Sequence, residues 1–269
     1  MPRYGVLGSP ISHSKSPVLH RAAYTALGLD WSYEAVELDR DRFDAWIASD
    51  GRQFAGCSVT MPLKHDLALR AGMRDAATEL TGVANTVVGL DSGVLTVANT
   101  DVAGIVESLR PVVSQPRSAR ILGAGATALS SLVALSELGV TEVQLDVRTP
   151  ERAVEACALA ERLELTVAVE RLCRERLETP VDILVSTVPA GALGEVARVY
   201  GDSAAVVLDV AYAPWPSELV SAGSAWTVVS GLEMLLHQAT RQIRLFHNGS
   251  VDEALPDEGA VVAAMREAL

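Results

Sequence analysis

Two glycines and a small residue in the middle of the chain have the types and spacing that bind a dinucleotide. Gly123-x-Gly125-x-x-Ala128 follows an apolar strand pattern and opens a helical one. The first glycine permits a tight turn, the second lets a pyrophosphate approach the backbone, and a small third residue lets helix and strand pack closely. The N–H groups of the helix N-terminus point at the phosphates. The pattern predicts nucleotide binding, with a plain tight turn as the alternative.

The next strand pattern, Glu142–Val147, should end at the adenosine ribose. Asp146 lies near the position where an acid binds the ribose hydroxyls of NAD. Arg148 and Arg152 could instead hold the 2′-phosphate of NADP, because a guanidinium matches phosphate geometry and stays charged. A solvated turn, with Arg152 paired to a nearby acid, is the structural alternative. The residues alone leave these interpretations open.

Polar residues of the first hundred positions gather where predicted strands end. Ser14 and Ser16 follow the first strand and start a helix, where hydroxyls and helix N–H groups could receive a carboxylate. Simple N-capping by Ser14 or Ser16, with Ser16 the plausible N-cap, is the alternative. Asn85 lies in an apolar strand and needs partners if it is buried. Lys64 taken alone is typical of a surface lysine and Asp101 of a helix cap, but so many polar groups at one end of a small sheet indicate a site.

Composition narrows the class of protein. The 269 residues are 49% hydrophobic and 21% charged, an ordinary globular profile, and the net charge is −12. Such an acidic excess repels phosphate backbones, which argues against nucleic acid as the main partner. The three cysteines, Cys57, Cys157 and Cys173, have neither metal-ligand spacing nor the pattern of a disulfide framework. Neither a signal peptide nor a membrane span is evident. We therefore expect a reduced cytoplasmic protein without a metal.

Strand and helix patterns alternate along the chain, which predicts an α/β fold with helices on both faces of open sheets. A polar, proline-containing stretch at 114–118 is the best linker candidate from composition alone. The expected strands are Tyr4–Gly8, Trp31–Leu38, Phe54–Met61, Val83–Leu90, Gly93–Ala98, Arg120–Leu122, Glu142–Val147, Leu165–Val169, Val181–Val185, Ala204–Val210 and Trp226–Val229. The expected helices are Ser16–Leu27, Asp41–Ser49, one from about Lys64, Val102–Val112, one ending at Leu138, Glu151–Leu163, Gly231–Phe246 and Glu258–Leu269.

Several stretches, in order and spanning nearly the whole chain, closely resemble shikimate dehydrogenases. Jointly they are highly specific, which no single one is. They are Gly8-Ser9-Pro10-Ile11-Ser12-His13-Ser14-Lys15-Ser16-Pro17, Ser58-Val59-Thr60-Met61-Pro62-Leu63-Lys64, Ala84-Asn85-Thr86, Asn99-Thr100-Asp101, Gly123-Ala124-Gly125, Arg148-Thr149, Asp209-Val210-Ala211-Tyr212 and Gly231-Leu232-Glu233-Met234-Leu235-Leu236-His237-Gln238.

The resemblance implies two α/β domains with a cleft between them. Residues 1–101, completed by C-terminal helices at about 238–269, would form the substrate-binding catalytic domain, and residues 102–237 a Rossmann-like NADP-binding domain. The implied reaction is the reversible, NADPH-dependent reduction of 3-dehydroshikimate to shikimate in aromatic amino-acid biosynthesis. A monomer or homodimer with only small-molecule ligands is expected.

The resemblance also implies roles for individual residues. Lys64 and Asp101 would be the catalytic pair, with Lys64 stabilising and protonating the developing alkoxide and Asp101 orienting it. Substrate would be bound by Ser14, Ser16, Thr60, Asn85, Asp101, Tyr212 and Gln238. The cofactor would be bound by Gly123, Ala124, Gly125, Ala126, Thr127, Arg148, Thr149, Arg152, Thr187, Val210 and Gly231.

The chain departs from the family pattern at four positions. Ser58 stands where Asn is common, and Ala126 replaces a glycine of the loop. Val147 replaces the Asn of an Asn-Arg-Thr motif, and Asp146 precedes it, so cofactor choice is open, with NADP favoured over NAD. A quinate/shikimate or aminoshikimate dehydrogenase using NAD is one alternative. A non-catalytic nucleotide-binding regulator is another, which intact Lys64 and Asp101 disfavour.

Overall fold

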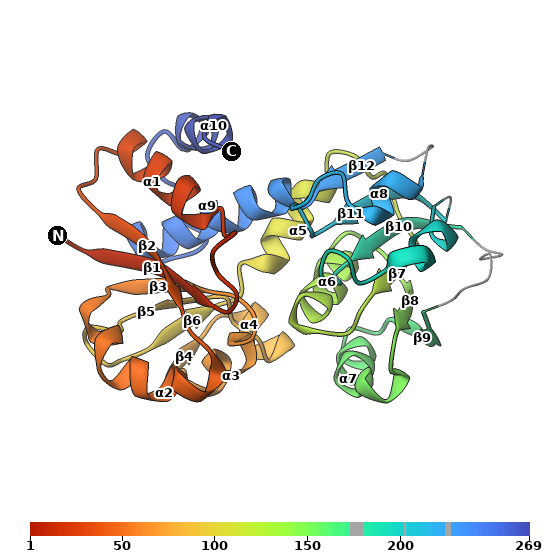
Figure 1. Cartoon of the computed structure of the whole chain (residues 1–269), viewed down its shortest axis with the longest axis horizontal. Helices are drawn as coiled ribbons and strands as arrows, with labels where there is room; N and C mark the ends of the chain where they lie inside the picture. The colour runs from red at the N-terminus through yellow and green to blue at the C-terminus, as the bar shows by residue number, and fades with distance from the viewer. Residues whose placement is uncertain (173–179, 202, 224–226) are drawn as a thin grey trace. The chain divides into compact units, whose positions relative to one another are not determined.

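The computed structural model describes residues 1–172, 180–201, 203–223 and 227–269 (Figure 1). The chain divides into two compact units. Unit 1 comprises residues 1–101 and 235–269, and unit 2 comprises residues 102–234. The chain leaves unit 1 within α5 (Asp101–Leu109) and returns to it within α9 (Gly231–Asn248).

Unit 1 is built on a mixed six-stranded sheet in the order β2-β1-β3-β5-β6-β4. Strand β1 is parallel to β2 and β3, whereas β5 is antiparallel to β3 and β6. Its strands are β1 (Arg3–Gly8), β2 (Ser32–Glu37), β3 (Gly56–Val59), β4 (Met73–Arg74), β5 (Thr86–Val88) and β6 (Thr96–Ala98). Its other helices are α1 (Ser16–Ala26), α2 (Arg40–Ala48), η1 (Asp50–Gln53), α3 (Lys64–Arg70), α4 (Ala76–Thr81) and α10 (Glu258–Glu267).

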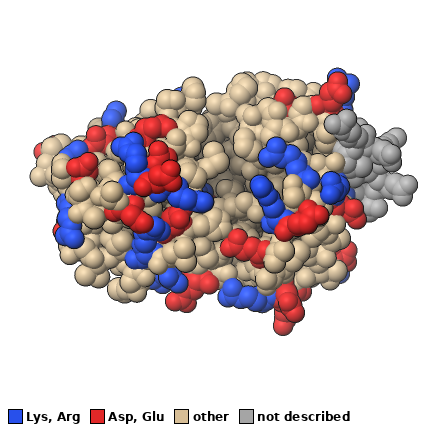
Figure 2. Space-filling model, turned by 60° about the horizontal axis from the view of Figure 1, so that its bottom comes forward, with Lys and Arg blue, Asp and Glu red and all other residues tan. Residues whose placement is uncertain are grey.

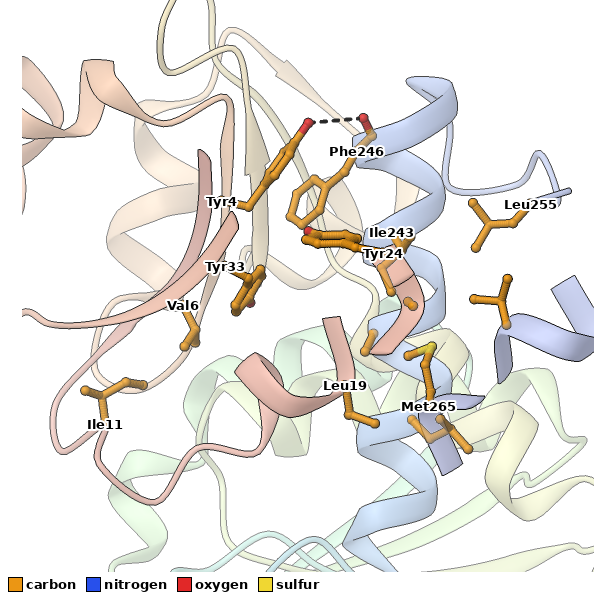
Figure 3. Packing of buried hydrophobic residues seen from close by; sticks show 14 residues of the cluster. Tyr4, Val6, Ile11, Leu19, Tyr24, Tyr33, Ile243, Phe246, Leu255 and Met265 are labelled. Atoms are coloured by element: carbon orange, nitrogen blue, oxygen red, sulfur yellow. Dashed lines mark hydrogen bonds between the residues drawn. The ribbon is translucent and has the colours of Figure 1, made fainter. Parts of the chain in front are cut away.

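Strand alternation in β1 divides the core of unit 1 into two layers. Tyr4 and Val6 face a cluster that includes α1, α9 and α10, and Leu7 faces a second cluster with α2 and α3. In the first cluster the ring of Tyr4 stacks on that of Phe246, 4.6 Å between centroids, and the Tyr4 hydroxyl donates to the Phe246 carbonyl at 3.4 Å (Figure 3). Helix α10 lies beside α1 (Figure 1). This packing fixes α9 against β1.

The topology of unit 1 collects its polar residues at one sheet edge. Because β3 and β6 are both antiparallel to β5, the carboxyl ends of β1, β3 and β6 and the amino end of β5 share one edge. Ser14 and Ser16 follow β1, Thr60 follows β3, Asn85 precedes β5 and Asp101 follows β6.

Unit 2 is a six-stranded parallel sheet in the order β12-β11-β10-β7-β8-β9. Buried apolar strands such as Val181–Ser186 suit a sheet covered on both faces. The elements are β7 (Ser118–Leu122), α6 (Ala126–Glu137), β8 (Glu142–Val147), η2 (Pro150–Arg152), α7 (Val154–Arg162), β9 (Thr166–Arg171), β10 (Val181–Ser186), η3 (Gly194–Val199), β11 (Ala204–Asp209), α8 (Glu218–Ala222) and β12 (Thr227–Ser230). The predicted α/β fold with two sheets is confirmed.

Two details differ from the sequence predictions. The proposed linker at 114–118 lies inside unit 2, where Asp182 accepts hydrogen bonds from the amides of Arg117 and Ser118 and ties this turn to β10. The short elements β4, α4, η1, η3 and α8 were not expected, because two to six residues carry little periodicity. Trp226 and Cys173 lie outside the described residues.

The surface has mixed charge on the face shown in Figure 2, where acidic and basic side chains are interspersed. Within the described parts of the chain, no helix combines the length and apolar character that a membrane crossing requires.

Candidate active site

Four predicted site residues of unit 1 form one hydrogen-bonded group, here called the polar cluster: Lys64, Asn85, Asp101 and Gln238. Lys64 Nζ donates to Asp101 Oδ2 at 2.5 Å. Asn85 Nδ2 donates to Asp101 Oδ1 at 2.8 Å and lies 3.3 Å from Gln238 Oε1. The side chains of Lys64 and Asp101 are only 13% and 5% exposed. An ion pair so shielded from water is strong and well oriented.

The backbone around Lys64 explains its position at the sheet edge. Thr60 follows β3, and its carbonyl accepts from the Leu63 amide at 2.9 Å, which turns the chain so that Lys64 begins α3. The Lys64 carbonyl accepts from the Ala84 amide at 3.0 Å, one residue before Asn85. The lysine is thus held next to the start of β5, although taken alone it resembled a surface residue.

Asn85 is buried and its carboxamide is oriented by several partners. Its Oδ1 accepts from the Thr100 amide at 2.9 Å and from the Thr86 hydroxyl at 2.8 Å, and its Nδ2 donates to Thr100 Oγ1 at 2.9 Å. Thr100 is therefore part of the site, and sequence reasoning did not single it out. Its place between Asn99 and Asp101 was the available signal.

The two predicted carboxylate-binding serines lie on the loop after β1. Glu37 holds this loop by accepting from the Ser9 hydroxyl at 2.6 Å and from the Ile11 amide at 2.9 Å. The prediction that Ser16 is the N-cap of α1 is wrong: Lys15 takes that position without a side-chain cap, and Ser16 is the first, buried residue of the helix. The serines share the sheet edge with the polar cluster but have no hydrogen bond with it among the described residues.

The predicted nucleotide loop of unit 2 has room for a phosphate. Gly123 has a φ of +107°, and a Cβ there would lie 2.7 Å from Thr187 Oγ1, so the β7–α6 turn requires glycine. A Cβ at Gly125 would meet nothing within 4 Å. Helix α6 begins at Ala126 with no side-chain cap, which leaves the N–H groups of Ala126 and Thr127 at a positive helix end. These features fit a bound pyrophosphate.

Other predicted cofactor residues follow the carboxyl ends of parallel strands of the same sheet. Thr187 follows β10 and donates to the Leu122 carbonyl at 2.8 Å, beside the glycine turn after β7. The chain order reverses between β7 and β10, and ligands of open α/β sheets bind at such a switch point. Val210 follows β11, and Gly231 follows β12; a Cβ on Gly231 would lie 2.3 Å from the Val210 carbonyl. Tyr212 is half-buried two residues after Val210.

The residues predicted to meet the adenosine ribose lie in the last part of β8 and just after it; some are at the surface and one is in the core. Arg148, Thr149 and Arg152 are exposed, as a 2′-phosphate site requires. Asp146 is fully buried, so the alternative that it binds the ribose of NAD is wrong. Its carboxylate lies in the core of unit 2, where its neighbours are other side chains of that unit.

The side chains that contact the Asp146 carboxylate are polar and almost as buried as Asp146 itself. The Tyr200 hydroxyl donates to Asp146 Oδ2 at 2.7 Å, and Arg120 Nε lies 3.5 Å from the same oxygen. Arg120 Nη2 donates to Gln144 Oε1 at 2.9 Å. Burial raises the pKa of the Asp146 carboxyl, and Tyr200 and then Arg120 oppose that rise. Across the residues described, no group of three His, Cys, Asp or Glu side chains could hold a metal ion.

Comparisons with known proteins agree with this geometry. A family model described as the shikimate dehydrogenase substrate binding domain matches residues 6–87. A shikimate dehydrogenase (NADP(+)) of Ruegeria sp. is 33% identical over 89% of this chain and 90% of its own length. The crystal structure of shikimate dehydrogenase from Mycobacterium tuberculosis superposes with a TM-score of 0.82 at 35% identity, covering 99% of each chain. The Thermus thermophilus enzyme in complex with NADP(H) and shikimate gives 0.80 at 30% identity, covering 100% of each.

Proposed function

Because this chain belongs to the shikimate dehydrogenase family, we propose that it catalyses the reversible NADPH-dependent reduction of 3-dehydroshikimate to shikimate, a step of aromatic amino-acid biosynthesis. The observation that carries the proposal is the Lys64–Asp101 pair, whose N–O distance is 2.5 Å at the edge of the unit 1 sheet. A binding protein without catalysis has no need of a shielded ammonium held by a carboxylate.

Lys64 supplies the proton of the reaction. An ammonium has three N–H donors, and Asp101 uses one of them, so a substrate oxygen can take another. During reduction the carbonyl carbon gains a hydride and its oxygen becomes an alkoxide. Lys64 stabilises that charge and gives the oxygen a proton; in the oxidation of shikimate the neutral amine accepts the proton instead. Asp101 keeps the lysine pointed at that oxygen.

The other polar groups of unit 1 hold the substrate. Asn85, Gln238 and Thr60 offer hydrogen bonds to ring hydroxyls from the same sheet edge. Ser14 and Ser16, at the N-terminus of α1, offer two hydroxyls to the carboxylate, where the helix end also favours negative charge. Residues 1–101 with 238–269 would therefore be the substrate-binding catalytic domain.

Unit 2 binds the cofactor, NADP(H). When bound, its nicotinamide supplies or accepts the hydride. The uncapped start of α6 and the open space at Gly125 accept the pyrophosphate. Exposed Arg148 and Arg152 would hold the 2′-phosphate, and Thr149 would add a hydroxyl. Val210, Gly231 and Tyr212 would line the nicotinamide end, so residues 102–237 would form the cofactor domain. Cytoplasmic location and a monomeric or homodimeric state stay predictions.

The test is the initial rate of shikimate oxidation by the purified protein, followed by nicotinamide absorbance, with NADP and NAD in parallel and quinate as second substrate. Turnover with shikimate and NADP supports the proposal. Equal rates with NAD or quinate would place the protein in the catabolic branch of the family. No turnover with any pair would refute the catalytic function.

A further inference from the structure

Helix α9 carries two glutamines that contact Asn85. Gln238 contacts the Asn85 side chain, and Gln242 contacts its main chain. Gln238 Oε1 lies 3.3 Å from Asn85 Nδ2, and Gln242 Nε2 donates to the Asn85 carbonyl at 3.3 Å. The two glutamines are four residues apart, one above the other on the same helix face. Asn85 is therefore held at both its side chain and its backbone by one helix.

We propose that Gln242 is a positioning residue of the substrate site. It holds α9 against β3 and the start of β5, so that the side chains of Gln238 and Asn85 have the correct relative positions for binding substrate. This inference rests on the proposed function. Gln242 does not contact substrate itself, because it is 1% exposed and its hydrogen bonds all go to protein groups.

The partners of Gln242 fix the orientation of its carboxamide. The Ser58 hydroxyl donates to its Oε1 at 2.7 Å, and His20 Nε2 lies 3.2 Å from the same oxygen. Since Oε1 only accepts, the His20 proton must reside on Nε2, and Nδ1 accepts from the Tyr24 hydroxyl at 3.3 Å. A flipped carboxamide would set Gln242 Oε1 against the Asn85 carbonyl oxygen, so this hydrogen bond fixes its orientation.

Burial keeps the network neutral. His20 is 0% exposed, stacks on the Tyr33 ring with 4.0 Å between centroids, and its pKa is lowered by burial to about 3. Tyr24 and Tyr33 belong to the core cluster drawn in Figure 3. A neutral, fully buried set of hydrogen bonds is rigid, because breaking any one leaves a polar group without water.

The same network extends from α9 to β2. The Tyr33 hydroxyl donates to Ser58 Oγ at 2.6 Å. Ser58 stands where the family commonly has Asn. The Ser58 hydroxyl joins Tyr33 to the Gln242 carboxamide of α9. The connection joins Tyr33 on β2 to Asn85 through Ser58 and Gln242.

The test is steady-state kinetics of Gln242→Met, which keeps side-chain volume and removes the hydrogen bonds. We expect the KM for shikimate to rise about tenfold with kcat lowered less than threefold and the KM for NADP unchanged. A merely structural role would reduce the folded fraction, which lowers kcat and leaves KM alone. Thr240→Val is the matched control: this buried hydroxyl lies on the same helix and donates only to the Leu236 carbonyl at 3.0 Å.

Two further variants keep the test decisive if Gln242→Met does not fold. Ser58→Ala and Tyr33→Phe each remove one link, and we expect each to raise the KM for shikimate about threefold. The inference would be overturned if the KM for shikimate were unchanged in all folded variants, or if it rose only as much as in Thr240→Val. Turnover by the wild type would still support the proposed function in that case. Absence of shikimate turnover by the wild type would refute both.

Discussion

The Lys64 ammonium donates to one oxygen of the Asp101 carboxylate at 2.5 Å, while the other oxygen accepts from Asn85 at 2.8 Å. The two residues come from different elements, the first turn of α3 and the first residue of α5. Because each carboxylate oxygen of Asp101 accepts a hydrogen bond, the orientation of this carboxylate is fixed, and it in turn orients the lysine. Under the proposed function, this arrangement would prepare the pair for proton transfer before substrate binds.

Replacement of Lys64 by alanine removes the proposed proton donor and leaves the residues of unit 2 unchanged. We expect kcat for shikimate oxidation to fall about 10²- to 10⁴-fold, the range for loss of a general acid–base group, with NADP affinity within twofold of wild type. Steady-state rates and fluorescence titration with NADPH measure the two quantities.

Arg40→Ala is the control for Lys64→Ala, since Arg40 also forms an ion pair with α3, to Asp66 at 2.6 Å, but is 59% exposed. Its kcat should equal that of the wild type. A Lys64→Ala protein with intact turnover and weakened NADPH binding would contradict the role assigned to the lysine.

The fold, and the gathering of polar residues where the strands of unit 1 end, could be predicted from the sequence because both depend on local patterns. Continuous apolar runs gave the parallel strands of unit 2, and the polar residues at strand ends met because the strands share an edge. Lys64 required the family resemblance, since a single lysine at a helix start has no distinguishing pattern.

What could not be predicted depends on contacts between distant segments. Gln242 and His20 are 222 residues apart and meet inside the core of unit 1. Asp146 resembled a ribose-binding acid by its place in the chain, and only the packing of Arg120 and Tyr200 against it shows that it is buried. Neither contact leaves a periodic signal.

The proposed 2′-phosphate site predicts a change in cofactor choice. We expect Arg148→Ala and Arg152→Ala each to weaken NADP binding about 10- to 100-fold, the loss of a charge-assisted hydrogen bond, with NAD binding altered less than threefold. Calorimetric titration with both nucleotides measures this. Arg162→Ala, at the far end of α7, should change neither affinity. Equal losses for NADP and NAD would show that the arginines do not distinguish the nucleotides.

A substitution at Gly125 should weaken cofactor binding without affecting folding. Because a Cβ at this position meets nothing within 4 Å, we expect Gly125→Val to change the midpoint of thermal unfolding by less than about 2 °C. The added side chain would occupy the phosphate position and weaken NADPH binding at least about tenfold. Gly231→Val is the contrasting variant, since its Cβ would lie 2.3 Å from a carbonyl, and it should unfold at lower temperature. Unchanged NADPH affinity in Gly125→Val would place the pyrophosphate elsewhere.

Asp146 should matter for stability and not for cofactor choice. Asp146→Asn keeps an acceptor for Tyr200 but leaves the buried Arg120 guanidinium without a counter-charge, which costs about 3 kcal/mol of unfolding free energy. Adding Arg120→Met removes the orphaned charge and should restore most of the loss. Urea unfolding gives the free energies, and NADP and NAD titrations of the folded protein should match the wild type. If Asp146→Asn shifted cofactor preference toward NADP, the Asp146 carboxylate would be the group that binds the ribose.

His20 makes the protein sensitive to acid. Its pKa is about 3 in the folded chain, because it is buried, against 6.5 when unfolded. Between these values the unfolded chain binds a proton that the folded chain does not, so this residue lowers stability as pH falls, by up to about 1.4 kcal/mol per pH unit.

His20→Phe keeps the ring beside Tyr33 and removes the titration. Near pH 7.5 the variant should be about 1 kcal/mol less stable, since Tyr24 and Gln242 each lose one partner. Below pH 6 its unfolding free energy should fall less steeply than that of the wild type, so the two curves converge and then cross. Urea unfolding at half-unit steps from pH 7.5 to 4.5 measures both slopes; parallel curves would mean that His20 becomes charged without opening the core.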